Sequence, residues 1–253
     1  MNLDRVTVTG ADDSIGRPEN LLDLTREFPF VEWGILVHAK GAGEPRFPSD
    51  NWISDLQRLV KGGHKMPLSL HVCGRWVRDL LIGNMTIPES LLFGFDRVQL
   101  NFHAENTSVD PPRFYEAMHQ LRRGRQFIFQ IDGNKGNAHL ESLMLEDATE
   151  GNLDLVPLFD ISGGAGVLPS AWPVPDSAGD EVDYRYYGYA GGLGPENLAE
   201  QIPLIGKAAG ETRIWIDMET RVRSEDDEQF DLAKVRQCLE IAKPFVRQGE
   251  PSM

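Results

Sequence analysis

The stretch FDISGGAG at residues 159–166 decides the fold, together with YAGGLGPENLAE at 189–200 and IWIDMET at 214–220. In the first stretch an apolar run delivers Asp160 into a glycine-rich turn. The second run ends at Gly191 and Gly192, directly before a helix start, and the third ends in Asp217. Three consecutive strands that end in acidic or glycine-rich loops are typical of the carboxyl-terminal rim of a (β/α)8 barrel.

Short apolar runs alternate with helical patterns along the whole chain, as in repeated β–α units. The eight predicted strands are Arg5–Thr9, Trp33–His38, Leu68–Val72, Arg97–Asn101, Gln126–Ile131, Leu155–Asp160, Tyr186–Ala190 and Arg213–Asp217. The predicted helices are Arg17–Arg26, Ser49–Lys61, Arg75–Ile82, Pro111–Arg122, Ala138–Leu145, Pro195–Ala208 and Asp231–Val246. Residues 167–185 hold three prolines and little periodicity, so the helix after the sixth strand is expected to be irregular or missing. The sequence therefore predicts the α/β class, with a single TIM-barrel domain over residues 1–246 and a frayed tail at 247–253.

The length of 253 residues suits one such barrel, which needs roughly 250 residues. Its 25 Lys and Arg stand against 39 Asp and Glu, which argues against nucleic acid or an anionic membrane as a partner. The expected partner is a small-molecule substrate, no cofactor is predicted, and the oligomeric state is left open. Two cysteines make no disulfide framework, and neither a membrane-length apolar run nor a signal-peptide core is present. We therefore expect a cytoplasmic protein.

One face of several predicted strands is unusually polar for a parallel barrel. In LSLHVCG (68–74) the apolar residues alternate with Ser69, His71 and Cys73, and alternate side chains share a face. We expect the apolar faces to pack on the helices and the polar faces to converge on the barrel axis. Unpartnered polar groups there would cost about 1–3 kcal/mol each, so a polar ligand pocket follows. The alternative is a wet interior in which these groups bond one another and water.

The three motifs of the opening stretch, in this order, resemble phosphoribosylanthranilate isomerase. In that family the sixth strand ends in L-L-D before a G-G-x-G loop and a Trp, the seventh in G-G-L-x-P-E-N and the eighth in V-D-x-S-S-G-V-E. EPRFPSDNW (44–52) and RVQLNFHAE (97–105) resemble the family's second loop and fourth strand. The resemblance implies a ribulose-phosphate-binding barrel and an Amadori rearrangement, which needs a general acid and a general base.

The resemblance assigns the general acid to Asp160, for which a turn-capping role is the structural alternative. The family's base is a Cys at the end of the first strand, and Thr9 occupies that position here. A threonine hydroxyl is not a usable base near neutral pH without a partner of its own. The second catalytic group must then come from elsewhere, and the candidates left open are Asp12, Asp13, Asp132, His71 and Cys73.

The resemblance also implies phosphate binding by glycine-bearing loops that present backbone N–H groups at a helix start. The matching residues are Gly163, Gly164, Gly191, Gly192, Thr220 and Arg221. The loop after the eighth strand departs from the pattern, because it lacks glycine and Glu219 introduces a carboxylate where an anion would sit. Either Arg221 or Arg223 compensates, or Glu219 points away, or the ligand is not phosphorylated.

Further substrate-binding residues follow from the same comparison. Arg46, Asn101 and Asp217 match family positions that would orient the substrate, and the polar strand face adds His71. Only His71 and Cys73 place two metal ligands on one strand face, so no metal site is predicted.

The functional interpretation is a divergent enzyme that acts on a small polar, sugar-like or phosphorylated metabolite. Its acid/base chemistry is placed at Asp160, with Thr9 and Asp132 completing the expected catalytic set. Two alternatives stay open: a barrel that binds a metabolite without turnover, and the parent isomerase with a relocated base.

Overall fold

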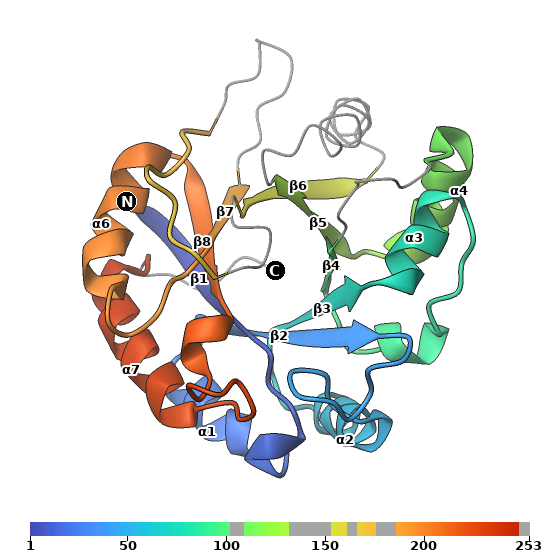
Figure 1. The fold of residues 1–253 in the computed structure, drawn as a ribbon, viewed down its shortest axis with the longest axis horizontal. Helices are drawn as coiled ribbons and strands as arrows, with labels where there is room; N and C mark the ends of the chain where they lie inside the picture. The colour runs from blue at the N-terminus through green and yellow to red at the C-terminus, as the bar shows by residue number, and fades with distance from the viewer. Residues whose placement is uncertain (102–108, 132–152, 161–165, 176–185, 248–253) are drawn as a thin grey trace.

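The protein is a closed barrel of parallel strands in a computed structural model that describes residues 1–101, 109–131, 153–160, 166–175 and 186–247. Eight strands pair in sequence order and β8 closes on β1 (Figure 1). The strands are β1 (Asn2–Thr9), β2 (Val31–His38), β3 (Leu68–Cys73), β4 (Arg97–Asn101), β5 (Gln126–Ile131), β6 (Asp154–Phe159), β7 (Tyr186–Ala190) and β8 (Arg213–Met218). The predicted (β/α)8 barrel of a single domain is therefore confirmed.

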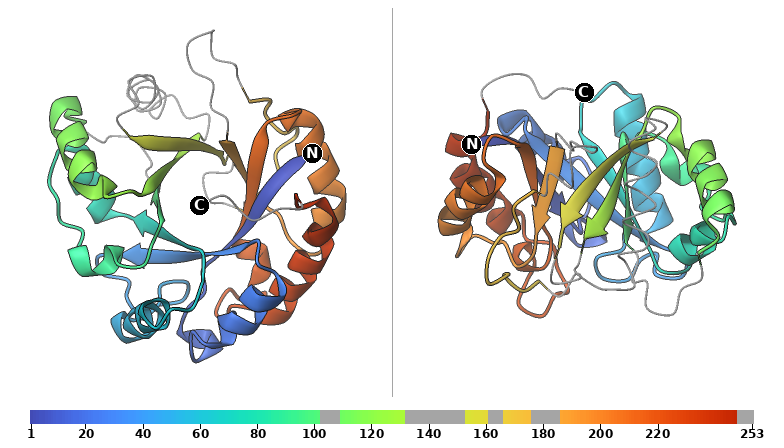
Figure 2. Two further views of the ribbon diagram at one scale, coloured as in Figure 1. Left: turned by 180° about the vertical axis from the view of Figure 1, so that it is seen from behind. Right: turned by 90° about the horizontal axis from the view of Figure 1, so that it is seen from above.

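Helices surround the strands on the outside, as Figure 2 shows from two further directions. Within the described residues they are α1 (Asn20–Glu27), α2 (Asp50–Lys61), α3 (Arg75–Leu81), α4 (Pro111–Arg122), α6 (Leu198–Ala209) and α7 (Leu232–Ala242). Side-chain caps begin several of them: Ser49 accepts from Trp52 N in α2, and Asp231 accepts from Ala233 N and Lys234 N in α7. None of these helices combines the length and apolar character that crossing a membrane requires.

Three helix boundaries differ from the prediction by three or more residues. The helix expected from Arg17 begins at Asn20, and the one expected from Pro195 begins at Leu198. The last predicted helix ends at Ala242 and continues as the 3-10 turn Lys243–Phe245, because Pro244 has no N–H to donate to an α-helical hydrogen bond. The predicted helix Ala138–Leu145 lies outside the described residues. After β6, residues 166–175 are irregular, as expected.

The alternation of the strands divides the core into two parts. The apolar faces of the strands, such as Val6, Leu70 and Val98, are fully buried against the helices. A small second cluster lies inside the barrel and consists of Ile128, Val156, Leu158, Tyr186 and Trp215. Most of the remaining interior positions are polar, as the strand pattern predicted, with Leu36 and Gly34 among the exceptions.

At the amino-terminal end of the strands, the polar interior groups bond one another. Glu32 accepts hydrogen bonds from Thr7, Arg5 and Arg97. An irregularity in β1 at Asp4 lets a second acid face the same level, where it accepts from Arg213 and Tyr186. Here the predicted alternative of a self-paired interior holds.

At the C-terminal tail, Arg247 N donates to Leu3 O at 2.8 Å, and residues 248–253 lie outside the described residues.

Candidate active site

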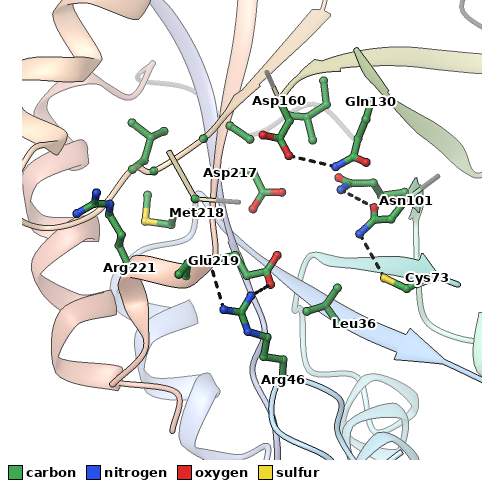
Figure 3. A pocket seen from close by; sticks show the side chains of 18 of the residues that line it. Leu36, Arg46, Cys73, Asn101, Gln130, Asp160, Asp217, Met218, Glu219 and Arg221 are labelled. Carbon is green, nitrogen blue, oxygen red and sulfur yellow. Dashed lines mark hydrogen bonds and ion pairs between the residues drawn. The ribbon is translucent and has the colours of Figure 1, made fainter. Parts of the chain in front are cut away.

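A cavity of about 330 Å³ lies at the carboxyl-terminal ends of the strands. Loops after β2, β3, β6, β7 and β8 contribute to its wall. Its polar lining residues are Arg46, Cys73, Gln99, Asn101, Gln130, Asp160, Asp217, Glu219, Thr220 and Arg221. Figure 3 shows the carboxyl groups of Asp160, Asp217 and Glu219 turned toward this same space. The strand ends that the sequence singled out therefore meet at one site.

Asp160 lies directly after β6 and is 5% exposed. Its backbone N–H donates to Ile131 O at 3.1 Å, which fixes it against the end of β5. Gln130 Nε2 donates to Asp160 Oδ2 at 3.4 Å, so the neighbouring strand also orients the carboxyl group. The structure thus places Asp160 where the sequence expected it, at the rim and facing the cavity.

Asp217 ends up beside Thr9 because β8 pairs with β1. Thr9 Oγ1 donates to Asp217 Oδ1 at 2.8 Å, and both residues are buried. Burial raises the pKa of Asp217 to about 8, and the carboxylates of Glu219, Glu32 and Asp160 add to this rise while the Thr9 hydrogen bond opposes it. The side chain therefore holds a proton at neutral pH.

A glycine in β2 makes room for this pair. A Cβ on Gly34 would lie 2.1 Å from Thr9 Oγ1 and 3.0 Å from His71 Cε1. His71 is 1% exposed and is not among the residues that line the cavity. Burial lowers its pKa to about 3, so the ring is neutral, and Nε2 has no hydrogen-bond partner among the described residues. The structure does not bring His71 together with the other expected substrate-binding residues.

The wall opposite β8 is built from thiol and amide groups. Asn101 Nδ2 donates to Cys73 Sγ at 3.4 Å, and Gln99 Nε2 donates to Asn101 Oδ1 at 2.9 Å. Burial raises the pKa of Cys73 to about 12, so its thiol is protonated at neutral pH. A protonated thiol is a poor base, which weakens Cys73 as the missing catalytic group.

Arg46 forms the mouth of the cavity next to Glu219. Its backbone has a φ of 73° and its N–H donates to Asp12 Oδ2 at 2.7 Å. Its guanidinium forms an ion pair with Glu219, while Nε donates to Asp227 Oδ2 at 2.6 Å. Nη2 lies 3.5 Å from Thr220 Oγ1. Burial raises the pKa of Glu219 although Arg46 opposes the rise.

The other arginines of the loop after β8 do not compensate Glu219. Arg221 pairs with Glu196 and points away from Asp160 and Asp217 in Figure 3. Arg223 is fully buried, where it donates to Asp12, Asp227 and the carbonyl oxygen of Gly10. Glu219 lines the cavity and does not point away from it. Two of the three explanations that the sequence left open, compensation by Arg221 or Arg223 and a Glu219 that points away, therefore do not hold.

The two glycines after β7 adopt φ values of 119° and 62°, which favour glycine. A Cβ on Gly192 would lie 2.7 Å from both Gly166 O and Leu168 N, and a Cβ on Gly166 would lie 3.1 Å from Thr220 Oγ1. The segment 166–168 therefore packs against the loop after β7 and also against Thr220. Gly191, Gly192 and Thr220 line the cavity, whereas Gly163 and Gly164 lie outside the described residues.

The remaining candidates for a second catalytic group are engaged elsewhere or fall outside the part of the chain that the structure describes. Asp12 accepts from Ser14, Arg46 and Arg223, and these hydrogen bonds outweigh burial and lower its pKa. Asp13 accepts from Ser49, and Asp132 lies outside the described residues. The sequence analysis gave Asp217 only an orienting role in substrate binding. The sequence feature that could have indicated an acid/base role is its position two residues before Glu219, on the strand that closes against Thr9. No group of three or more metal-ligating side chains occurs among the described residues.

Comparisons with known proteins reach only distant similarities. No protein-family model matches the chain, and no curated protein matches it. Among solved structures, it is similar to a phosphoribosyl anthranilate isomerase from Thermococcus kodakaraensis, with 14% identity, a TM-score of 0.43 and coverage of 98% of this chain and 100% of that one. It is also similar to a protein assigned as spore coat polysaccharide biosynthesis protein E from Chromobacterium violaceum, with 10% identity, a TM-score of 0.48 and coverage of 98% and 78%. Likenesses this distant carry no argument about activity or substrate, and the barrel itself rests on the strand order.

Proposed function

We propose that this chain is a divergent relative of phosphoribosylanthranilate isomerase that moves a proton within a small, unphosphorylated, sugar-like substrate. Asp217 is the general acid and Asp160 the general base. The observation that carries the proposal is the buried carboxyl group of Asp217, whose raised pKa keeps a proton on it at neutral pH. An acid–base pair needs one group that holds a proton and a second that accepts one, and Asp160 lines the same cavity.

The lining favours a neutral, hydroxyl-rich ligand. Gln99, Asn101 and Gln130 present amide groups, which both donate and accept hydrogen bonds and so suit hydroxyl groups. Glu219 adds a carboxylate at the mouth, and the only two cationic residues of the described lining, Arg46 and Arg221, already form ion pairs with carboxylates. A phosphate group that bound either arginine would have to displace one of these carboxylates.

The proposed step is an enolisation. Asp217 donates its proton to the carbonyl oxygen of the open-chain substrate, or to the corresponding imine nitrogen, while Asp160 takes the proton from the adjacent carbon. The enol that results is neutral, with Asp217 now ionised and Asp160 protonated. Return of a proton to the former carbonyl carbon, with loss of the proton of the neighbouring hydroxyl to Asp217, completes the isomerisation and restores both groups.

The position of Thr9 connects this proposal to the resemblance. Thr9 stands where the family has its cysteine base, and its hydroxyl donates to Asp217. The carboxyl group of Asp217 is thereby held next to the position where the family has its cysteine and where this chain has a threonine. In this proposal Asp217 supplies the second acid/base group, and the roles are exchanged relative to the family, so that Asp160 is the base. Thr9 is a positioning residue that orients Asp217.

Deuterium exchange into a panel of candidate substrates tests the proposal. The protein is incubated in D2O with neutral aldoses, ketoses and aldosylamines, and NMR follows the loss of the C–H signal next to the carbonyl or imine carbon. We expect exchange with at least one member, and a loss of about 100-fold or more in Asp217→Asn and in Asp160→Asn. Glu225→Gln, which removes an exposed carboxylate on the same side of the barrel, serves as the control and should exchange like the wild type.

The alternatives give different results in the same set of experiments. A panel member that raises the melting temperature without any exchange would support a metabolite-binding barrel instead. Growth of a tryptophan auxotroph that lacks the isomerase, when it carries this chain, would support the parent reaction and contradict the unphosphorylated substrate. Exchange that persists in Asp217→Asn would remove Asp217 from the acid role.

A further inference from the structure

We propose that Glu219 sets the charge selectivity of the cavity: it occupies Arg46 as an internal anion and so keeps phosphate-bearing ligands out. Without Glu219, Arg46 would be an anion-binding site. The inference concerns the same cavity as the proposed function and deepens it by naming the residue that selects the substrate class. It is a statement about binding and does not depend on turnover.

Every nitrogen of the Arg46 guanidinium faces an acceptor. Nε donates to Asp227 and Nη1 to Glu219, while Nη2 lies 3.5 Å from Thr220 Oγ1. Of these acceptors Glu219 and Thr220 line the cavity. An arginine that binds phosphate does so through two parallel N–H donors. An incoming anion therefore finds the cavity-facing side of Arg46 already occupied by the Glu219 carboxylate.

Arg46 does not depend on Glu219 for its position. Its backbone N–H is held by Asp12 at 2.7 Å and its Nε by Asp227 at 2.6 Å. Asp12 and Asp227 are in turn bonded to the buried Arg223. Removing the charge of Glu219 should thus leave the guanidinium at the mouth of the cavity with a donor to spare. This is why the site is a masked anion site and not merely a surface ion pair.

The surrounding charges act in the same direction. Glu219 shares the cavity with Asp160, and the proximity of Asp160 and Asp227 contributes to its raised pKa. Like charges that crowd one site disfavour any further negative charge there.

The test is a titration with inorganic phosphate at pH 7.5 by calorimetry and thermal shift, at constant ionic strength. We expect no saturable binding to the wild type and at least tenfold tighter binding to Glu219→Gln, with a rise in melting temperature that follows the phosphate concentration. Adding Arg46→Gln to Glu219→Gln should abolish the gain. Glu196→Gln is the matched control, because it removes the same charge from the other paired arginine of the lining, Arg221.

Each other outcome overturns the inference. Phosphate binding by the wild type as tight as by Glu219→Gln would mean that Glu219 masks nothing. A gain that survives Arg46→Gln, or that appears equally in Glu196→Gln, would reduce the effect to net charge. If Glu219→Gln does not unfold cooperatively, Glu219→Ala is titrated in its place, and no gain there contradicts the inference. Failure of deuterium exchange in the wild type bears on Asp217 and Asp160 and leaves this binding result unchanged.

Discussion

Each end of the barrel interior buries a carboxyl group, Glu32 at one end and Asp217 at the other, and the two groups differ in protonation at neutral pH. At the amino-terminal end Glu32 accepts from Arg97, Arg5 and Thr7 at 2.7–2.8 Å, and these partners overcome burial and lower its pKa to about 2. At the carboxyl-terminal end Asp217 accepts one hydrogen bond from Thr9, and burial raises its pKa to about 8.

The number of cationic donors decides the difference, since neither carboxyl group is more than 6% exposed. Arg97 also lies over the ring of Trp215, with its Cζ 4.2 Å from the ring centroid. The guanidinium that pairs with Glu32 is therefore also packed against an aromatic side chain. A buried carboxylate that is paired with cations stays ionised and contributes to the structure, whereas a buried carboxyl group without cationic partners stays protonated. The lower level, at the amino-terminal ends of the strands around Glu32, therefore has a structural role. The upper level, at the carboxyl-terminal ends around Asp217, is available for proton transfer.

The strongest test of this contrast is Glu32→Gln. It leaves the guanidinium groups of Arg97 and Arg5 buried without their carboxylate, so we expect a loss of about 3–5 kcal/mol in the free energy of unfolding. Urea denaturation measures it. Glu27→Gln, which breaks the half-exposed pair with Arg236, should cost less than about 1 kcal/mol. Equal losses in the two variants would mean that the lower level is not a special structural element.

Whereas Glu32→Gln should destabilise the protein, Asp217→Asn should become more stable relative to the wild type as the pH rises. The folded pKa of about 8 lies above the ordinary value of 3.8, so the folded state keeps a proton that the unfolded chain has lost, and this contribution to stability disappears as the pH rises from 3.8 to 8. Asparagine does not titrate. The stability of Asp217→Asn relative to the wild type should therefore grow by about 2–4 kcal/mol between pH 5 and pH 8.

Glu32→Gln is the control for that pH dependence. Glu32 titrates near pH 2, so its contribution to stability is fully present above its ordinary pKa of 4.5 and is lost only as the pH falls toward 2. Its difference from the wild type should stay constant between pH 5 and pH 8. A flat profile for Asp217→Asn as well would show that Asp217 is ionised throughout this range, and the contrast would fail.

The sequence predicted the upper level better than the lower one. Alternation within the strands placed Asp160, Asn101 and Asp217 at the rim, because a period of two in an apolar run is visible locally. The expected second strand began at Trp33, one residue after Glu32, so the central acid of the lower level was missed. Its partners Arg5 and Arg97 lie 27 and 65 residues away, and no local pattern joins them.

The chemistry of the site was beyond the sequence for the same reason. Thr9 and Asp217 are 208 residues apart and meet only because β8 closes against β1. Arg46 and Glu219 are 173 residues apart and meet through two loops. The motifs identified which residues reach the rim, but a pKa depends on burial and on neighbours that closure of the barrel supplies.

Gly34→Ala tests how tightly the side chains around Thr9 and Asp217 are packed. The added Cβ would lie 2.1 Å from Thr9 Oγ1, so Thr9 must move and its hydrogen bond to Asp217 must weaken. Overpacking of this kind costs about 1–3 kcal/mol, measured by urea denaturation. Thr9→Ala removes the hydroxyl that clashes, and the double variant should recover part of the loss. Additive losses in the double variant would contradict a contact between the two positions.

The smallest effect is expected from Thr9→Val, which keeps the shape of the side chain and removes one hydrogen bond, at a cost of about 1 kcal/mol. Its more informative result is a titration, because the Thr9 hydrogen bond lowers the pKa of Asp217. Without that bond the pKa should rise further, and NMR of the carboxyl carbon should detect a midpoint above that of the wild type. Thr7→Val removes the equivalent bond from Glu32, where Arg97 and Arg5 should keep the carboxylate ionised above pH 5. A midpoint for Asp217 that stays in place or falls in Thr9→Val would show that burial alone sets this pKa, and Thr9 would then be a packing residue.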